Sequence, residues 1–342
     1  MREAINAAVI HALGGKPVTI QRTPCGGGSS SARKEKVTVR MADGTPETYF
    51  LKSGRGKHVR VMLEGEHASL TAMHSAVMSI CPKPVAHGPV EGDPDSYFLL
   101  TAYLEPASRG YRKKRAAPSS PSLDSSCSAW SASPPLTLAA KLAKLHSTPA
   151  PIPPGFSKPQ FGFPVTTYCG DTPQNNSYNA SWATFYGENR LLAILRRCEE
   201  RNGRDLQLAD LISRVVETVV PRLLNSLKIV PVVVHGDLWS GNKITTVSPR
   251  GDQEEQFTFD PASCFAHGEY DLGMMRMFGG FGYDFWSEYD SLRGKDDPAE
   301  EFDDRLALYE LYHHLNHLAL FGPSYKSGAI EIMRQLLSKY DS

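Results

Sequence analysis

The stretch VVVHGDLWSGN, residues 232–242, places several polar side chains directly after an apolar strand. A tight turn needs little more than a glycine and an Asp, yet this segment also contains a His, a Trp and an Asn. Two short strands, KITTV and FTFD, follow around the turn SPRGDQEEQ, so the chain is expected to return Asp260 to the side of Asn242. The pattern therefore predicts that Asp237, Asn242 and Asp260 meet at one point.

This trio suits phosphoryl transfer. Four residues separate Asp237 from Asn242, which is the spacing of the protein-kinase catalytic loop. The Asp237 carboxylate can accept the proton of an attacking hydroxyl, while Asn242 and Asp260 offer hard oxygen ligands to Mg²⁺ that bridges nucleotide phosphates. The sequence therefore predicts ATP and Mg²⁺ as cofactors.

The remaining parts of a kinase site are expected upstream. Lys52 lies on the strand YFLK, and Glu66 in the following helix can hold it as an ion pair. A glycine run can lie over the phosphates, because glycine lets backbone N–H groups approach closely; its members are Gly26, Gly27 and Gly28. The segment TAYLE is expected to form a hinge whose backbone faces adenine, at Ala102, Tyr103 and Leu104.

The order of elements predicts an α+β protein-kinase-like fold with two lobes. Residues 1–104 contain two hairpin patterns around one helical pattern and form the expected strand-rich, nucleotide-binding N-lobe. Residues 105–135 are rich in Ser and Pro, carry the basic run RKKR and are expected to be a disordered insert with a solvated charge run. Residues 136–342 have mostly helical periodicity and form the expected C-lobe with the catalytic loop and the acceptor site.

Composition excludes several classes of protein. The 342 residues carry 37 basic and 37 acidic side chains, which argues against a general nucleic-acid or membrane-surface binder. No apolar run approaches 18 residues, and the N-terminus lacks the apolar core of a secretory signal. Six cysteines without a C-x-x-C pair fit reduced thiols. We therefore predict a cytoplasmic protein without nucleic-acid or membrane partners.

Three segments resemble the fructosamine-3-kinase family, also called ketosamine-3-kinases. They are HGDLWSGN, FDPASCFAHGEYDLGMMRMFGGF and LYHHLNHLALFG, and FGFPVTTYCGDTPQNN is similar to that family's mid-chain segment. The resemblance covers nearly the whole chain apart from residues 105–135. The tryptophan after HGDL is the feature that separates this family from the related aminoglycoside and choline kinases.

The resemblance implies ATP-dependent phosphorylation of the 3-hydroxyl of a ketosamine, the sugar adduct that glycation leaves on lysine; the phosphorylated adduct then breaks down and frees the amine. The partner would be a glycated protein or a small ketosamine. By match to the motif, Asp237 is the base, Asn242 and Asp260 bind Mg²⁺, and Lys52 with Glu66 holds phosphates. The acceptor would contact Trp239, whose indole attracts sugar carbons and a cationic amine.

Further residues are expected near the site. We place His267 at the acceptor and expect His235 and Asp271 to support the catalytic loop. Many family members carry a cysteine inside the glycine-rich loop, whereas here Cys25 precedes it, which puts a redox switch there in doubt. The insert is longer than the family's usual connection.

Alternatives remain open from the residues themselves. A small-molecule kinase of the aminoglycoside or choline type could attract a polycationic acceptor with the stretch 284–304, which contains nine acidic and two basic residues. A solvated charged surface is the plainer interpretation of this stretch. A nucleotide-binding pseudokinase scaffold is disfavoured by the intact trio. His313 and His317 have a zinc-compatible spacing, but no third ligand is evident and we expect core or interface histidines. The preference between ribulosamine and fructosamine depends on pocket shape.

Overall fold

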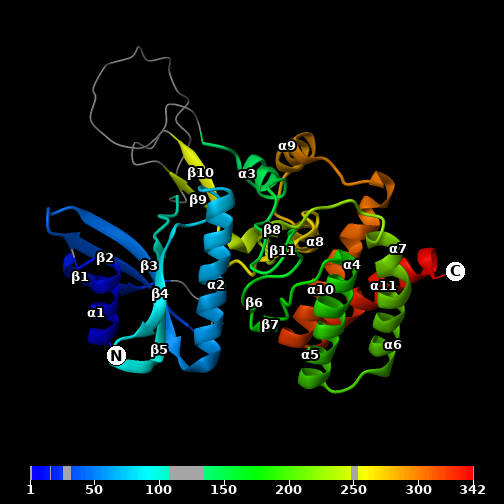
Figure 1. The fold of residues 1–342 in the computed structure, drawn as a ribbon, viewed down its shortest axis with the longest axis horizontal. Coiled ribbons are helices and arrows are strands. Elements are labelled where there is room, and N and C mark those ends of the chain that lie inside the picture. Colours follow the sequence, from blue (N-terminus) through cyan, green and yellow to red (C-terminus); the bar gives the residue numbers. More distant parts are fainter. Residues whose placement is uncertain (1, 16, 26–31, 108–134, 248–252, 342) are drawn as a thin grey trace, which may run out of the picture.

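The computed structural model describes residues 2–15, 17–25, 32–107, 135–247 and 253–341. Figure 1 shows a sheet-containing lobe beside a mostly helical lobe, with helix α2 standing between them. The predicted glycine-rich loop, at Gly26 to Gly28, and residues 108–134 of the predicted insert lie outside the described residues.

The N-lobe contains a five-stranded antiparallel sheet in the order β1-β2-β3-β5-β4. Both predicted hairpins are confirmed, because β2 pairs with β3 and β4 pairs with β5. Helices α1 and α2 belong to the same lobe (Figure 1). The bounds are α1 (Arg2–Ala12), β1 (Pro17–Pro24), β2 (Arg33–Met41), β3 (Pro46–Arg55), α2 (Gly56–Ala76), β4 (Pro84–Val90) and β5 (Asp93–Ala102).

The two faces of the sheet belong to different apolar cores. Phe98 and Leu100 of β5 pack in a small cluster with residues of α1, whereas Leu99 between them packs with Leu63 and Leu70 of α2. This alternation is the period-two pattern of a strand. The core that contains α2 continues into the helical lobe, so apolar packing joins the two lobes.

The C-lobe is built mainly from helices, as predicted. Helix α10 lies among α5, α7, α8 and α11 (Figure 1), and most of its residues are buried. One stripe, which includes Asp303, Glu310 and His314, stays partly exposed, so the remaining faces are the ones that pack against the other helices. The helices are α3 (Leu138–Leu145), α4 (Trp182–Tyr186), α5 (Ala193–Asn202), α6 (Leu206–Arg214), α7 (Val220–Leu224), α8 (Tyr270–Phe278), α9 (Tyr283–Arg293), α10 (Phe302–Phe321) and α11 (Lys326–Tyr340).

Short strand pairs position the segments that the motifs occupy. Strand β8 (Val232–Val234) pairs with β11 (Cys264–Ala266), and β9 (Lys243–Val247) pairs with β10 (Glu254–Thr258). A third pair joins β6 (Thr167–Cys169) to β7 (Thr172–Gln174). The β9–β10 hairpin returns the chain to the end of the catalytic loop, as the sequence predicted.

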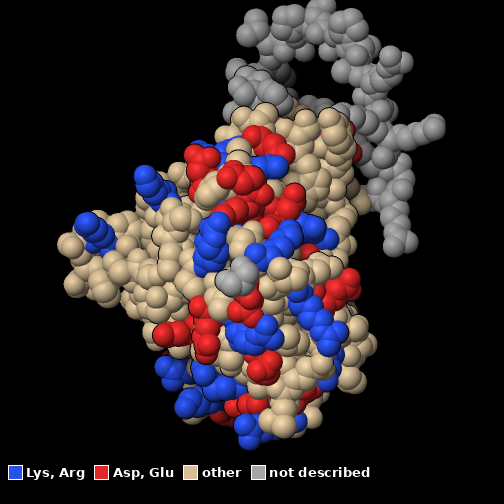
Figure 2. Space-filling view, turned by 90° about the vertical axis from the view of Figure 1, so that its right-hand side faces the viewer, with Lys and Arg blue, Asp and Glu red and all other residues tan. Residues whose placement is uncertain are grey.

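Charges of both signs mix on the face formed by the C-terminal helices. Figure 2 shows Lys and Arg interspersed with Asp and Glu there, and ion pairs such as Arg214 with Asp341 and Lys339 with Asp304 join them. This face therefore lacks the single-sign field that would attract a polyanion. No helix within the described ranges is long and apolar enough to cross a membrane.

Candidate active site

The catalytic loop is held from below by a buried carboxylate. Asp271, at the start of α8, accepts hydrogen bonds from the backbone N–H groups of His235 and Gly236, each at 2.7 Å. His146 lies 3.1 Å from the same carboxylate. Burial alone would raise the pKa of Asp271, but the bond and charge of His146 and the further donors outweigh it and lower the pKa. Asp271 is therefore a carboxylate anion that holds the catalytic loop in place.

Gly236 and His235 set the shape of this turn. Gly236 has φ of +80°, and a Cβ there would lie 2.1 Å from the carbonyl oxygen of Ala262, so only glycine fits. Burial lowers the pKa of His235, and the neutral ring donates from Nε2 to the carbonyl of Phe259 at 3.1 Å. Its Nδ1 accepts the backbone N–H of Asp237 at 3.3 Å, which aims the Asp237 backbone.

The predicted trio does meet. The side chain of Asn242 donates from Nδ2 to the backbone carbonyl of Asp237 at 2.8 Å. The backbone carbonyl of Asn242 accepts the backbone N–H of Phe259 at 3.0 Å. The next residue, Asp260, has a backbone φ of +56°, which is uncommon for a residue other than glycine. Residues held in such backbone conformations cluster at functional sites. Asp237, Asn242 and Asp260 all line one cavity of about 660 Å³.

Lys52 brings the two lobes together in this cavity. Its Nζ lies 2.7 Å from both oxygens of Glu66 and 2.7 Å from Oδ1 of Asp260. Burial opposes the ammonium charge, but the two carboxylates prevail and raise the pKa of Lys52. The same contacts, together with Lys34, outweigh burial and lower the pKa of Asp260. A charged lysine and a charged metal-ligand candidate thus stand side by side.

Asp237 has a different environment from Asp260. Burial and, next, the charge of Asp260 raise the pKa of Asp237 to about 7. No ammonium or guanidinium contact is recorded for it among the described residues, whereas Asp260 has two. Two carboxylates whose surroundings move their pKa values apart are typical of an acid–base site. The carboxyl with the higher proton affinity is the one expected to accept a proton.

The hinge residues line a second, smaller hollow of about 390 Å³ that shares Lys34, Glu66 and Asp260 with the first. The N–H groups of Ala102 and Tyr103 already donate to the carbonyls of Lys83 and Thr48. Among these three hinge residues, the backbone N–H left open to a ligand is therefore that of Leu104. Other lining residues are Cys25, Phe50, Leu70, Pro82, Thr101, Pro106, Gly241, Ile244 and Phe259.

Trp239 forms a wall of the larger cavity. Its indole lies over Gly241, where a Cβ would come within 2.3 to 2.6 Å of ring atoms, and its ring centroid is 5.5 Å from that of Phe278. The absence of a side chain at residue 241 is therefore what allows this orientation. The indole lines the same cavity as Asp237, and its contact with an acceptor stays a prediction.

The sequence did not predict Lys34, nor most of the other residues that line the larger cavity around Asp237. Lys34 on β2 faces Lys52 on β3 in the register of the hairpin, and its Nζ is 3.6 Å from Asp260. Counting back from the Asp43–Gly44 turn would have found it. No sequence pattern marked the other lining residues, which come from separate segments: Met62, Tyr168, Gly170, Asp171, Arg201, Pro261, Leu320 and Phe321.

The assignment of His267 to the acceptor is wrong. Its side chain is 1% exposed, and both ring nitrogens are engaged, Nδ1 with the hydroxyl of Tyr309 and Nε2 with Asp296, each at 2.8 Å. It is not among the residues that line the cavity. His267 lies one residue beyond β11 and packs inward under α10, so it supports the C-lobe core.

The two histidines of α10 that have the zinc-compatible spacing, His313 and His317, differ from one another. His317 donates from Nδ1 to the carbonyl of His313 at 2.8 Å, as an ordinary helix contact. His313 is fully buried, and burial lowers its pKa to about 3, so its ring is neutral. Neither of its ring nitrogens has a hydrogen-bond partner in the described part of the chain. His313 lies beside Cys169 and Asp237, whereas His317 is not part of this group.

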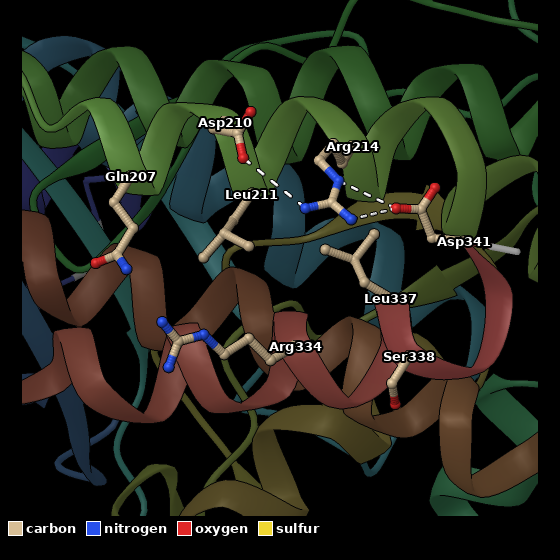
Figure 3. A pocket seen from close by; sticks show the side chains of 8 residues that line it. All are labelled: Gln207, Asp210, Leu211, Arg214, Arg334, Leu337, Ser338 and Asp341. Carbon is tan, nitrogen blue, oxygen red and sulfur yellow. Dashed lines mark hydrogen bonds and ion pairs between the residues drawn. The ribbon is translucent and has the colours of Figure 1, made fainter.

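Another hollow, of about 510 Å³, lies between α6 and α11 at the far end of the C-lobe (Figure 3). Its Arg214 is bound to Asp341 and Asp210, and none of the predicted site residues lines it. The candidate active site is therefore the cavity around Asp237.

Comparison with known proteins identifies the family. The model of the fructosamine kinase family matches residues 1–117 and 129–339. Ketosamine-3-kinase from Mus musculus is 40% identical over 177 residues, which are 52% of this chain and 54% of the mouse protein. The chloroplastic protein-ribulosamine 3-kinase from Arabidopsis thaliana is 31% identical over 292 residues, 85% of this chain and 76% of that protein.

The solved structures agree on the fold. A candidate fructosamine-3-kinase from Haemophilus somnus 129PT superimposes with a TM-score of 0.71 at 22% identity, and the match covers 98% of each chain. The predicted protein-kinase-like fold, with its strand-rich and helical lobes, is confirmed. Together with the match of the family model over nearly the whole sequence, this shows that the chain belongs to the fructosamine kinase family.

Proposed function

We propose that this protein transfers the γ-phosphoryl group of ATP to the 3-hydroxyl of ketosamines, the ribulosamine or fructosamine adducts of lysine. One observation carries the proposal: Asp237 and Trp239 line the same cavity as Lys52, Asn242 and Asp260. The cavity therefore combines a proton acceptor, a flat apolar wall and phosphate-binding groups. Membership of a kinase family and the names of the mouse and Arabidopsis relatives support this activity.

The donor side fits a nucleotide with Mg²⁺. Lys52 supplies a fixed positive charge for phosphate oxygens, and Glu66 keeps it in place. Asn242 and Asp260 offer oxygen ligands of the kind that Mg²⁺ prefers, and the bond from Asn242 Nδ2 to Asp237 fixes the amide orientation. Bound Mg²⁺ would neutralise phosphate charge. The hinge at Leu104 and the smaller hollow would take the adenine base.

The reaction needs one proton acceptor. The acceptor hydroxyl oxygen bonds to the γ-phosphorus while the bond to the bridging oxygen of ADP breaks, and the hydroxyl proton passes to Asp237. Asp271, His146 and the Gly236 turn hold the loop that carries this carboxylate. Because such chemistry depends mainly on positioning, this support matters as much as the base.

The acceptor side favours a sugar next to a cationic amine. The Trp239 indole offers a face for sugar carbons and for a positive charge. The carboxylate of Asp171 also lines the cavity, between His58 at 2.8 Å and Arg201 at 3.5 Å. Asp171 and Arg201 thus place both signs of charge on the cavity wall, although Asp171 is already paired and attracts an amine less than a free carboxylate would.

The aminoglycoside alternative finds no support in the acidic stretch 284–304. None of its residues lines the cavity, and several of its carboxylates are already paired: Asp296 with Arg293, Glu301 with Arg222, Asp303 with Arg276 and Asp304 with Lys339. Paired acids attract a polycation less than free ones do. The pseudokinase alternative is disfavoured by the assembled trio.

The test is ADP release with a panel of acceptors: ribulose-lysine, fructose-lysine, kanamycin and choline, each with and without Mg²⁺. We expect release with one or both lysine adducts, and phosphate at the 3-position of the product by NMR. Faster release with kanamycin or choline than with either adduct would overturn the proposal. Free and glycated-protein adducts are compared in the same assay; cytoplasmic location stays a prediction from the sequence.

A further inference from the structure

We infer that Cys169, Asp237 and His313 form a site for a thiophilic divalent cation such as Zn²⁺, directly behind the catalytic base, and that filling it inhibits phosphoryl transfer. The binding part stands on geometry alone. The inhibition part rests on the proposed function, because it requires Asp237 to be the base.

The three side chains offer the ligand set of a zinc site. A Cys sulfur, a carboxylate oxygen and a His nitrogen all lie within 4.8 Å of one another. Zinc binds these ligands at about 2.0 to 2.3 Å in a tetrahedron, which places ligand atoms roughly 3.5 Å apart. Side-chain rotations of small amplitude can close that difference. The residues come from the end of β6, the catalytic loop and the middle of α10, so three separate elements fix the site.

His313 gives an independent reason to expect a ligand here. It is fully buried, and neither ring nitrogen has a partner among the described residues. Its surroundings are the rings of Tyr270 and Tyr312, with centroids 5.9 and 5.1 Å away. Buried polar atoms without a hydrogen bond are rare and call for an explanation. A neutral imidazole facing a thiol and a carboxyl is ready to coordinate a metal.

The surroundings of Cys169 meet the next requirement. Asn316 donates from Nδ2 to Sγ of Cys169 at 3.2 Å, a contact that orients the sulfur. Burial and the charge of Asp237 raise the pKa of this thiol, so the thiolate forms only as the cation displaces the proton. A thiolate and a carboxylate together balance the charge of Zn²⁺, which a buried site requires. Asp237 also borders the 660 Å³ cavity. That opening gives the ion an entry path and leaves its fourth position to water.

The ligand chemistry separates this site from that of Mg²⁺. Mg²⁺ demands oxygen ligands, whereas thiolate and imidazole select Zn²⁺ and similar ions. In a second group, His267, Glu269 and Asp296 are also close enough to share a metal ion. Their carboxylates are already paired with Arg305 and Arg293, so they are not free to bind one. The site behind Asp237 is therefore distinct from both.

Inhibition follows from the shared carboxylate. On binding, Zn²⁺ replaces the proton of the Cys169 thiol, which leaves to solvent, and takes a lone pair of Asp237. The Asp237 carboxylate then cannot accept the hydroxyl proton of the acceptor. Removing the metal with a chelator restores it, so the effect is reversible.

Binding is tested first, without any kinase assay. The full chain is stripped with EDTA and titrated with Zn²⁺ by equilibrium dialysis, and with Co²⁺ while thiolate-to-metal charge-transfer absorption is recorded. We expect one tight Zn²⁺ per chain and a cobalt–thiolate band, with affinity at least about tenfold weaker in Cys169→Ala and in His313→Asn. Cys198→Ala is the matched control, since Cys198 is equally buried and contacts α10 at Leu315.

Circular dichroism tests whether each variant is folded. If one variant is not folded, the other variant and the cobalt spectrum of the wild type decide whether the site exists. Absence of the cobalt–thiolate band, or equal Zn²⁺ affinity in all four proteins, would overturn the site.

Inhibition is tested next by ADP release at saturating ATP and Mg²⁺. We expect Zn²⁺ to inhibit wild type and Cys198→Ala, EDTA to reverse it, and Cys169→Ala to need at least about tenfold more Zn²⁺. Equal inhibition of all variants would show that Zn²⁺ acts elsewhere and overturn the regulatory part. If no ketosamine is phosphorylated but binding still depends on Cys169 and His313, the proposed function fails and the metal site stands.

Discussion

The ammonium of Lys52 lies 2.7 Å from a carboxylate oxygen of Asp260, although 208 positions separate the two residues. This contact joins the strand-rich lobe to the helical lobe and places a phosphate-binding cation beside a metal-ligand candidate. Glu66 holds the same ammonium from its other side. Nucleotide phosphates would therefore enter between Lys52 and Asp260 and exchange this ion pair for contacts to the phosphate oxygens.

The role of Asp237 as base is tested by Asp237→Asn. We expect turnover to fall about 10² to 10⁴-fold, the usual contribution of a positioned general base, with nucleotide affinity and melting temperature close to wild type. ADP release gives the turnover, and calorimetric titration with ADP gives the affinity. A change of less than about threefold in turnover would exclude Asp237 as the base.

The metal-binding role is tested by Asn242→Ala and Asp260→Ala. Each variant should need more Mg²⁺ and should nearly abolish transfer, because phosphate charge then lacks compensation. Activity is measured as a function of Mg²⁺ at fixed ATP. Lys243→Ala, next to Asn242 but bound to the Gly280 carbonyl at 2.6 Å, is the matched control and should keep the wild-type Mg²⁺ requirement. Unaltered Mg²⁺ titrations in both site variants would refute the assignment.

Trp239 is expected to set acceptor affinity. Removal of the indole in Trp239→Ala should raise KM for ribulose-lysine roughly three- to thirtyfold, because a cationic amine on an indole contributes roughly 0.5 to 2 kcal/mol. KM for ATP should move little. Trp239→Phe keeps a flat ring, so its KM for ribulose-lysine should lie between those of the wild type and Trp239→Ala. Steady-state kinetics on both substrates decide the matter, and an unchanged KM for the adduct in the alanine variant would remove Trp239 from the acceptor site.

The anionic state of Asp271 gives a prediction about acid stability. Asp271→Asn should lower the free energy of unfolding at pH 7 by about 3 kcal/mol, since the buried partner His146 and two backbone N–H groups lose their carboxylate. The pKa of Asp271 is lower in the folded chain, so its contribution is complete above the unfolded pKa of about 3.9 and is lost as pH falls through the folded value.

The difference between wild type and Asp271→Asn should therefore stay constant from about pH 7 to 5 and shrink below about pH 4. Urea unfolding at several pH values measures it. A difference that grows toward acid pH would mean that the carboxyl is protonated in the folded protein. Asp210→Asn, on an exposed carboxylate of α6, serves as the control for general charge effects.

We propose that residues 105–135 contain an insert in the chain between the predicted N-lobe and C-lobe; its first residues are described and Pro106 forms a bridge with Thr246 of β9. The family model leaves residues 118–128 unmatched. Replacing residues 108–133 with a short Gly/Ser linker should keep activity on small ketosamines and the melting temperature, because the segment has no apolar periodicity to lose. A melting temperature lower by more than about 5 °C would show that it packs.

The sequence by itself determined the local parts of this protein. The spacing from Asp237 to Asn242 fixes both on one short loop, and the hairpin after it returns Asp260, because consecutive strands joined by few residues pair in few possible registers. The alternation of Val37 and Val39 similarly predicted the first hairpin, and the helical spacing after it placed Glu66 within reach of Lys52. These features depend on neighbours within a few tens of residues.

Only the tertiary structure decided which distant side chains share a cavity. Tyr168, Asp171 and Arg201 meet Trp239 because α5 and the β6–β7 pair pack beside the catalytic loop, and no periodicity records that. His267 was misplaced for the same reason, since one residue beyond β11 the side chain turns inward to Tyr309. The approach of Cys169 and His313 to Asp237 also arises from packing between elements. Periodicity states which face of an element is apolar, whereas the partner of that face depends on how all the elements fill one core.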